Sequence, residues 1–296
     1  MFLIGVGVNA TFLLCIPAEE STAMPYRLAP YFVLVVMAVI IAGFWPSYFT
    51  KWTDVPWQFH AHGIAASLWV TLVFVQSWTA HHGRLDLHRA VGKASLLLFP
   101  FLIGGFAGII DLTSKGYVAA NDPVRIMFGP SFLVGMAVAI AAYVTIFYRA
   151  LRWRRKVWIH AGYMLATPLF LFESPFSRVL NMVVPAFAIR GPQDFPLIMD
   201  SILWSMALEL AFIAAIWMKY RERANPFLVT GGFIVLQMLT MGLMGDAAFL
   251  KTLLVALGGV PSLAVWGIGF ALGAATAWLG WEKGRRPAAA VRPTPA

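Results

Sequence analysis

The feature that most constrains this chain is a succession of apolar runs, each about as long as a bilayer is thick. A membrane-spanning α-helix needs about 20 consecutive apolar residues. Eight runs of that kind follow one another, at 28–48, 60–81, 94–113, 127–149, 158–183, 198–218, 227–247 and 253–281. Because lipid offers no partner to backbone polar groups, each run is predicted to be helical. The predicted fold is an all-α polytopic transmembrane bundle of about eight spans.

Composition agrees with a membrane environment. Only 12% of the 296 residues are charged and 60% are hydrophobic, with a mean hydropathy of +0.76. Soluble domains carry about 25% charged residues, so the lipid bilayer is the expected solvent. The net charge of +9 does not indicate nucleic acid, because the basic residues form short clusters between apolar runs. The single cysteine, Cys15, excludes an intrachain disulfide and a CxxC site.

The distribution of basic residues predicts the orientation. Most of the 22 Lys and Arg residues lie before the first span, in alternate loops, or after the last span. The richest segments are 84–93, 149–156, 219–223 and 283–292. Because cytoplasmic loops are enriched in Lys and Arg, these segments are predicted to lie inside the cell. Both termini are therefore predicted to be cytoplasmic.

The chain is predicted to contain one membrane domain, residues 24–283. Residues 1–23 form an N-terminal extension whose apolar part is short for a span. Either it is a weak extra hydrophobic segment or the native start is Met24, and we favour Met24. Residues 284–296 are rich in Pro and Ala and are predicted to form a disordered cytoplasmic tail.

All six histidines lie near the ends of predicted spans. They are His60 and His62 at the outer end of the second span, and His81, His82, His88 and His160 on the inner side. Imidazole is a common metal ligand and a proton carrier near neutral pH, although it is also routine at membrane interfaces. A bis-histidine haem needs ligands from two helices at matched depth. Only the inner side offers that, so the inner histidines are the candidate ligands of haem b or a transition metal. The outer pair is a weaker candidate metal site.

One face of the second span is polar. His62, Trp69 and Gln76 recur at seven-residue intervals and therefore lie near one face of a helix. Since lipid cannot satisfy their hydrogen bonds, this face is predicted to look into the bundle. It serves either to hold helices together or to line a functional cavity. In the fifth span, Pro168 and Pro175 are predicted to interrupt the helix.

Two carboxylates are predicted near the membrane midplane. Glu173 and Glu209 lie about ten residues from the outer ends of two consecutive antiparallel spans, so they can meet at the same depth. Arg178, one to two turns nearer the outside, could neutralise one of them. Two close carboxylates cannot both stay charged without a cation. The alternatives are a proton site, a metal site, or a buried Glu–Arg pair with a structural role.

A series of motifs extends over about residues 30–180. It consists of His62-Gly63, Trp69, Gln76, His88-Arg89-x-x-Gly92, His160-x-x-x-Met164 and Arg178. This series resembles an uncharacterised family of bacterial multipass membrane proteins, in which a later helix opens with His-Lys-Arg-x-Met. Here Ala161-Gly162 replaces the Lys-Arg. The resemblance implies a multi-pass protein of the bacterial inner (plasma) membrane, and no activity. The HR-x-x-G loop is also remotely similar to loops in ascorbate-reducible transmembrane cytochromes b, which implies haem.

Three functions are compatible with these features. The first, which we favour, is a membrane redox or metal-dependent protein that uses the inner histidines. The second is a proton-coupled small-molecule transporter that uses Glu173, Glu209 and Arg178, with His60 and His62 at its outer mouth. The third is a non-catalytic sensor or assembly factor. The candidate ligand is a quinone or another small molecule, and whether the protein is an enzyme stays open.

Overall fold

The computed structural model describes residues 24–285. The predicted extension 1–23, with Cys15, and residues 286–296 of the predicted tail lie outside the described residues. Between residues 24 and 285 the chain is helical, with no strand. The predicted all-α class is therefore confirmed.

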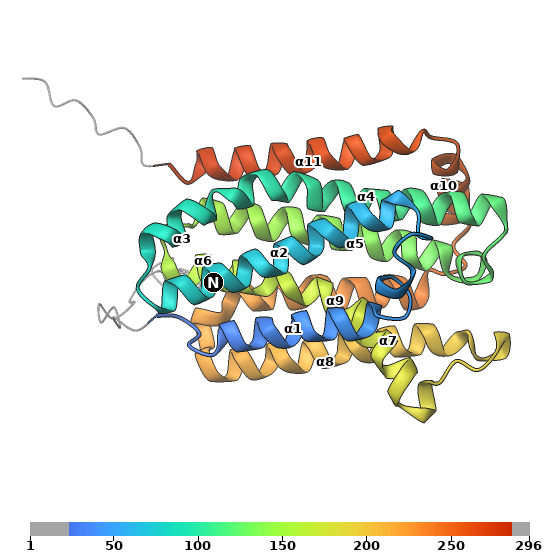
Figure 1. The fold of residues 1–296 in the computed structure, drawn as a ribbon, viewed down its shortest axis with the longest axis horizontal. Coiled ribbons are helices and arrows are strands. Elements are labelled where there is room, and N and C mark those ends of the chain that lie inside the picture. The colour runs from blue at the N-terminus through green and yellow to red at the C-terminus, as the bar shows by residue number, and fades with distance from the viewer. Residues whose placement is uncertain (1–23, 286–296) are drawn as a thin grey trace, which may run out of the picture.

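The described chain forms α-helices, most of which lie roughly along a common axis (Figure 1). They are α1 (Ala29–Phe44), α2 (Trp57–His81), α3 (Leu85–Gly92), α4 (Ala94–Ala119), α5 (Pro123–Arg152), α6 (Val157–Ala166), α7 (Glu173–Val183), α8 (Pro196–Tyr220), α9 (Asn225–Leu243), α10 (Ala248–Gly258) and α11 (Ser262–Lys283). A 3-10 segment, η2 (Thr167–Leu171), joins α6 to α7. The described chain begins and ends at the same end of the bundle, where α3 also lies (Figure 1).

Five helical stretches are long and apolar enough to cross a membrane: α2, α4, α5, Pro192–Leu243 and α11. Pro192–Leu243 contains both α8 and α9, which pack side by side. The chain reverses between them at Arg221, whose backbone φ is +51°. The apolar segments Ala29–Phe44, Val157–Leu171 and Ala248–Gly258 are shorter. The helices thus support a membrane protein, with fewer full-length candidate spans than the eight predicted runs.

Proline and glycine explain where the predicted runs and the helices differ. The eighth run, 253–281, is wrong as one helix, because α10 ends at Gly258 and α11 starts after Pro261. The first run extends to residue 48, whereas α1 ends at Phe44, just before Pro46. Trp45 still has helical backbone angles, with φ −53° and ψ −55°, but Pro46 has no N–H with which to continue the helical hydrogen bonds. In the fifth run, η2 interrupts the helix at Pro168, as the sequence predicts. The same prediction for Pro175 is wrong, because Pro175 lies in the first turn of α7, where a proline removes no helical hydrogen bond.

Small residues let α4 approach α2 and α11 closely. A Cβ added at Gly269 of α11 would lie 2.6 Å from the Ala107 Cβ of α4. A Cβ added at Gly105 of α4 would lie 2.8 Å from the His62 Cα of α2. Such close backbone approach is typical of helices that pack in lipid. The glycines of the third and eighth runs therefore position α2, α4 and α11 against one another.

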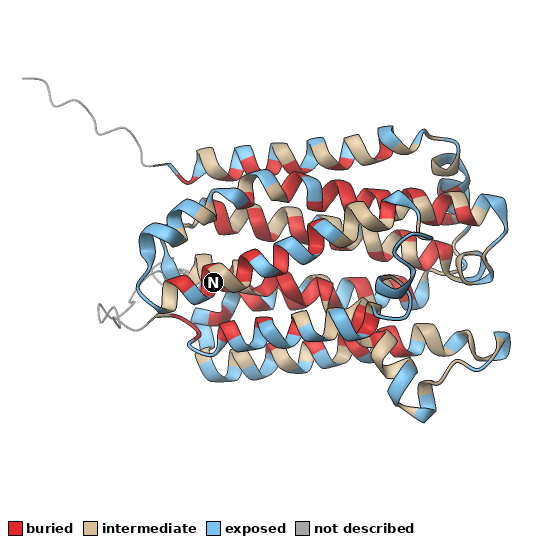
Figure 2. Cartoon of the chain, viewed as in Figure 1, coloured by how far each residue is buried: buried red, intermediate tan, exposed pale blue. Residues whose placement is uncertain are grey.

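The outer surface of the bundle is apolar. Buried residues lie along the helix faces that look inward (Figure 2), whereas Leu97, Leu243 and Leu263 are about three-quarters exposed, at 74%, 79% and 75%. Large apolar surfaces of this kind are costly in water and mark a partner or a membrane. Because they recur on several helices, we assign this surface to bilayer contact.

Candidate functional site

Two of the four inner histidines lie in the same region of the bundle and contact backbone carbonyls. His88 of α3 and His160 of α6 lie close enough for their charges to interact. The His88 Nδ1 lies 3.1 Å from the backbone oxygen of Gln76, and the His160 Nδ1 lies 2.9 Å from that of Ala150. A carbonyl oxygen only accepts, so each Nδ1 carries the proton and donates it. A ring that is protonated at Nδ1 alone keeps its Nε2 lone pair for a ligand, as in histidines that bind metals.

The other two inner histidines contact other groups. His81 lies with Nδ1 2.7 Å from the Ser77 oxygen and Nε2 3.0 Å from the Pro25 oxygen. His82 is exposed and stacks on Trp78, with ring centroids 4.1 Å apart. Among residues 24–285, no group of three or more His, Cys, Asp or Glu side chains is arranged to hold a metal ion. A metal or haem centre at this end would therefore depend on His88 and His160. These two side chains would supply the two protein ligands that a bis-histidine haem needs.

The two outer histidines contact different elements. The His60 Nδ1 lies 3.1 Å from the Tyr48 hydroxyl, in the segment between α1 and α2. The His62 ring packs on Phe106 of α4, with centroids 4.7 Å apart. Side chains two residues apart on a helix do not face each other. The prediction that His60 and His62 form a weaker metal site is therefore supported only by their being histidines.

The polar stripe of α2 lies inside the bundle. Trp69 is fully buried and its Nε1 donates to the Thr167 Oγ1 at 2.9 Å. The Tyr143 hydroxyl of α5 donates to the Thr167 backbone oxygen at 2.7 Å. Gln76 is also buried, and its Nε2 has no hydrogen-bond partner within the described chain. Thr167, the first residue of η2, thus joins three segments at the point where the fifth run loses its α-helical hydrogen bonds.

Glu173 and Glu209 lie next to each other in the interior. Glu209 of α8 is 2% exposed, and its carboxylate lies against the backbone of Glu173, the first residue of α7. The Glu209 Oε1 is buried and has no hydrogen-bond partner among residues 24–285. The helix break at η2 brings the positive end of the α7 dipole to these carboxylates. Ser201 and Ser205 extend the buried polar face of α8 outward.

Arg178 does not form the direct ion pair that the sequence suggested. Its Nη1 donates to the backbone oxygen and the hydroxyl of Ser174, both at 2.7 Å. Its guanidinium lies over the Phe44 ring, 4.9 Å from the centroid. Within 24–285 no ion pair joins Arg178 to a carboxylate. Arg178 therefore interacts with the Glu173 carboxylate only through the longer-range attraction of their charges.

An apolar groove of about 480 Å³ reaches Glu209. It lies between α1 and α8, with η2 and the end of α6 behind them. Glu209 lines one part of the groove, and Lys219 and Tyr220 line the part at the end of α8. A cavity with apolar walls and few polar groups is the usual form of a small-molecule site.

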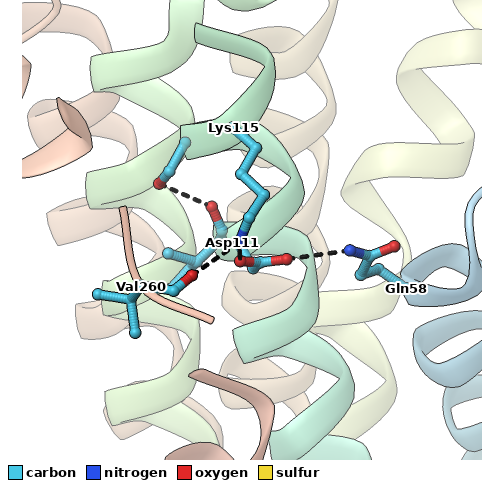
Figure 3. Close-up of polar contacts among 6 residues, drawn as sticks. Gln58, Asp111, Lys115 and Val260 are labelled. Atoms are coloured by element: carbon cyan, nitrogen blue, oxygen red, sulfur yellow. Dashed lines mark hydrogen bonds and ion pairs between the residues drawn. The ribbon is translucent and has the colours of Figure 1, made fainter. Parts of the chain in front are cut away.

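A second buried polar cluster was missed by the sequence reasoning. Asp111 of α4 is fully buried and accepts a hydrogen bond from the Gln58 Nε2 at 3.0 Å (Figure 3). It also forms an ion pair with Lys115, whose Nζ donates to the Val260 oxygen at 2.9 Å. An aspartate inside an apolar run, with lysine four residues later, was the available signal. The cluster ties the α10–α11 break to α4 and α2.

The comparisons with known proteins give no match. No protein-family model, curated protein or solved structure matches the chain. The chemistry of the site is therefore argued from its own residues, which offer two arrangements: a carboxylate in an apolar groove, and a pair of histidines with free Nε2 atoms.

Proposed function

We propose that the protein is an integral membrane protein of eight spans with both termini in the cytoplasm. The spans are α1, α2, α4, α5, the broken helix α6–η2–α7, α8, α9 and α11. Two observations support this: the described ends lie together in Figure 1, and the most basic loops are alternate ones. We also propose that the protein lies in the bacterial plasma membrane and that it is related to the family that its motif series resembles.

Single-cysteine labelling tests this topology. In a Cys15→Ser background, Asp54→Cys and Asp246→Cys should react with an impermeant maleimide on intact cells. Asp86→Cys should react only after permeabilisation. All three positions are exposed, so a difference reports the side of the membrane. Labelling of Asp86→Cys on intact cells would contradict the orientation.

We further propose that the protein is a proton-coupled carrier of a small, lipophilic molecule. The observation that carries this proposal is the buried Glu209 carboxylate, which lines an apolar groove and has an oxygen without a partner among residues 24–285. An isolated charge in apolar surroundings is costly. With Glu173 beside it and Arg178 engaged by Ser174, the site favours taking up a proton or a cationic group.

Infrared difference spectra recorded against pH test whether Glu209 exchanges a proton. The wild-type protein should show a C=O band of a protonated carboxyl that changes with pH, and Glu209→Gln should remove it. Glu222→Gln is the matched control, because Glu222 lies exposed in the turn after α8 and its loss should leave that band in place. A band unchanged by Glu209→Gln would refute the proton site.

The His88–His160 pair supports a second candidate, a haem- or metal-dependent redox protein. The supporting observation is that both Nδ1 atoms point to backbone carbonyls. Haem or a transition metal bound there would supply electron transfer. An absorption spectrum and metal analysis of detergent-purified protein test this candidate. His88→Ala or His160→Ala should abolish a Soret band or bound metal, whereas His82→Ala, a change of an exposed ring, should not. A colourless, metal-free sample would eliminate it.

A further inference from the structure

The groove that contains Glu209 opens on the outer surface of the bundle. Leu28, Phe32, Val35 and Leu208 line it and are 51%, 45%, 55% and 46% exposed. These residues belong to α1, the segment just before it, and α8. If α1 and α8 span the bilayer, their exposed faces meet acyl chains rather than water. The opening is then lateral, and a ligand reaches Glu209 from the lipid phase.

The charges along the groove differ between its two ends. Among the described lining residues, Glu209 is the acidic one and Lys219 is the basic one. Ten residues of helix separate them, which corresponds to about 15 Å along α8. Lys219 is exposed and its Nζ lies 5.4 Å from the centroid of the Tyr220 ring. The lysine is therefore too far away to neutralise Glu209.

The walls beside the carboxylate suit a cation with apolar substituents. Phe172 and Phe212 line the groove near Glu209, and Tyr26 and Tyr220 line its far end. Faces of aromatic rings attract ammonium groups, and more strongly where water is excluded. Apolar side chains make up most of the remaining wall. The groove thus combines one carboxylate that forms no ion pair among residues 24–285 with surfaces for an alkyl or aryl group.

We propose that this groove binds a lipophilic amine, which enters from the leaflet that contains Lys219 and Tyr220. Its ammonium group pairs with Glu209 and its apolar part lies between α1 and α8. The exchange balances in charge: the protonated carboxyl loses its proton to water as the O–H bond breaks, and the ammonium ion takes the proton's place as counterion. This inference rests on the proposed carboxylate site and specifies its substrate class and its lateral route.

Binding of a dansyl-labelled alkylamine to detergent-purified protein tests the inference. The matched probe is the dansyl-labelled alcohol of equal chain length, which has the same apolar part and no charge. We expect the amine to bind at least about tenfold more tightly than the alcohol. Glu209→Gln should remove this preference, and proton release into a weakly buffered solution should accompany binding of the amine to the wild type only.

A second pair of variants tests the route without changing a charge. Ala215 lines the groove, whereas its exposed neighbour Ala214 is not part of the wall. Ala215→Trp should weaken amine binding about tenfold or more, and Ala214→Trp should leave it unchanged. Equal binding of amine and alcohol, or an amine preference that survives Glu209→Gln, would overturn the inference, even if infrared spectra support the proton site. Conversely, Glu209-dependent amine binding without an infrared change would refute the carrier and retain the amine site.

Discussion

A substitution of glycine by alanine should have opposite effects at two positions of α11. At Gly269, the added Cβ would lie 2.6 Å from the Ala107 Cβ and 2.9 Å from the Ile103 backbone oxygen. At Gly267, no described atom lies within 4 Å of the added Cβ. The two positions share one helix and lie two residues apart. The comparison therefore isolates packing from helix propensity.

The expected magnitudes follow from these distances. Alanine is favoured over glycine in a helix interior by about 1 kcal/mol, and both variants gain this amount. Overpacking a close contact costs about 1–3 kcal/mol, and only Gly269→Ala incurs that cost, because its neighbours include backbone that cannot rotate away. Gly267→Ala should thus stabilise the protein slightly. Gly269→Ala should be about 1–3 kcal/mol less stable than Gly267→Ala.

Thermal unfolding in detergent, followed by intrinsic tryptophan fluorescence, measures the difference. The wild type and both variants should be compared at one protein and detergent concentration. Gly267→Ala should melt at or above the wild-type temperature, and Gly269→Ala below it. Equal melting temperatures for the two variants, or a more stable Gly269→Ala, would show that α4 and α11 do not approach as closely as described.

Two further predictions concern the ends of the bundle. Asp111→Ala should lower the free energy of unfolding by about 1–3 kcal/mol, because it leaves the buried Gln58 amide without its acceptor. Asp111→Asn keeps an acceptor oxygen and should cost less; equal losses in denaturant unfolding would contradict this reason. At the other end, burial raises the pKa of the Tyr26 phenol above its usual range, so the folded protein holds that proton more tightly than the unfolded chain. Stability should therefore fall as pH rises above about 10, where the unfolded phenol ionises. Tyr26→Phe should flatten this fall in the melting temperature while losing the 2.8 Å hydrogen bond to the Arg223 oxygen; an equally steep fall in the variant would refute the assignment.

Much of the fold could be predicted from hydropathy and from the positions of the prolines. The apolar runs located the helices because lipid forces backbone groups to pair within each segment. Run length alone did not separate α10 from α11, since apolar residues continue through Gly258, Gly259 and Val260. The reversal at Arg221 lies in the basic segment 219–223 that the sequence predicts as a loop, but its positive φ is unusual for a non-glycine residue and has no marker in the sequence.

The site was only partly accessible from sequence. Matched depth on neighbouring spans brought Glu173 and Glu209 into consideration, and the structure places them side by side. The position of Arg178 was harder to predict, because its choice of Ser174 and Phe44 over a carboxylate depends on rotamers and on where α1 packs. The groove was beyond prediction, since it arises from a gap between α1 and α8 that only tertiary packing defines.

The short 3-10 segment η2 sets the length and the rotation of the fifth apolar run. A 3-10 helix turns about 120° and rises about 2.0 Å per residue, against about 100° and 1.5 Å for an α-helix. Rewinding the five residues of η2 into α-helix would therefore rotate α7 by about 100° and draw it in by about 2.5 Å. Such a screw motion would move Glu173 relative to Glu209 while α6 stayed in place, so the local winding of one segment fixes how the two carboxylates face each other.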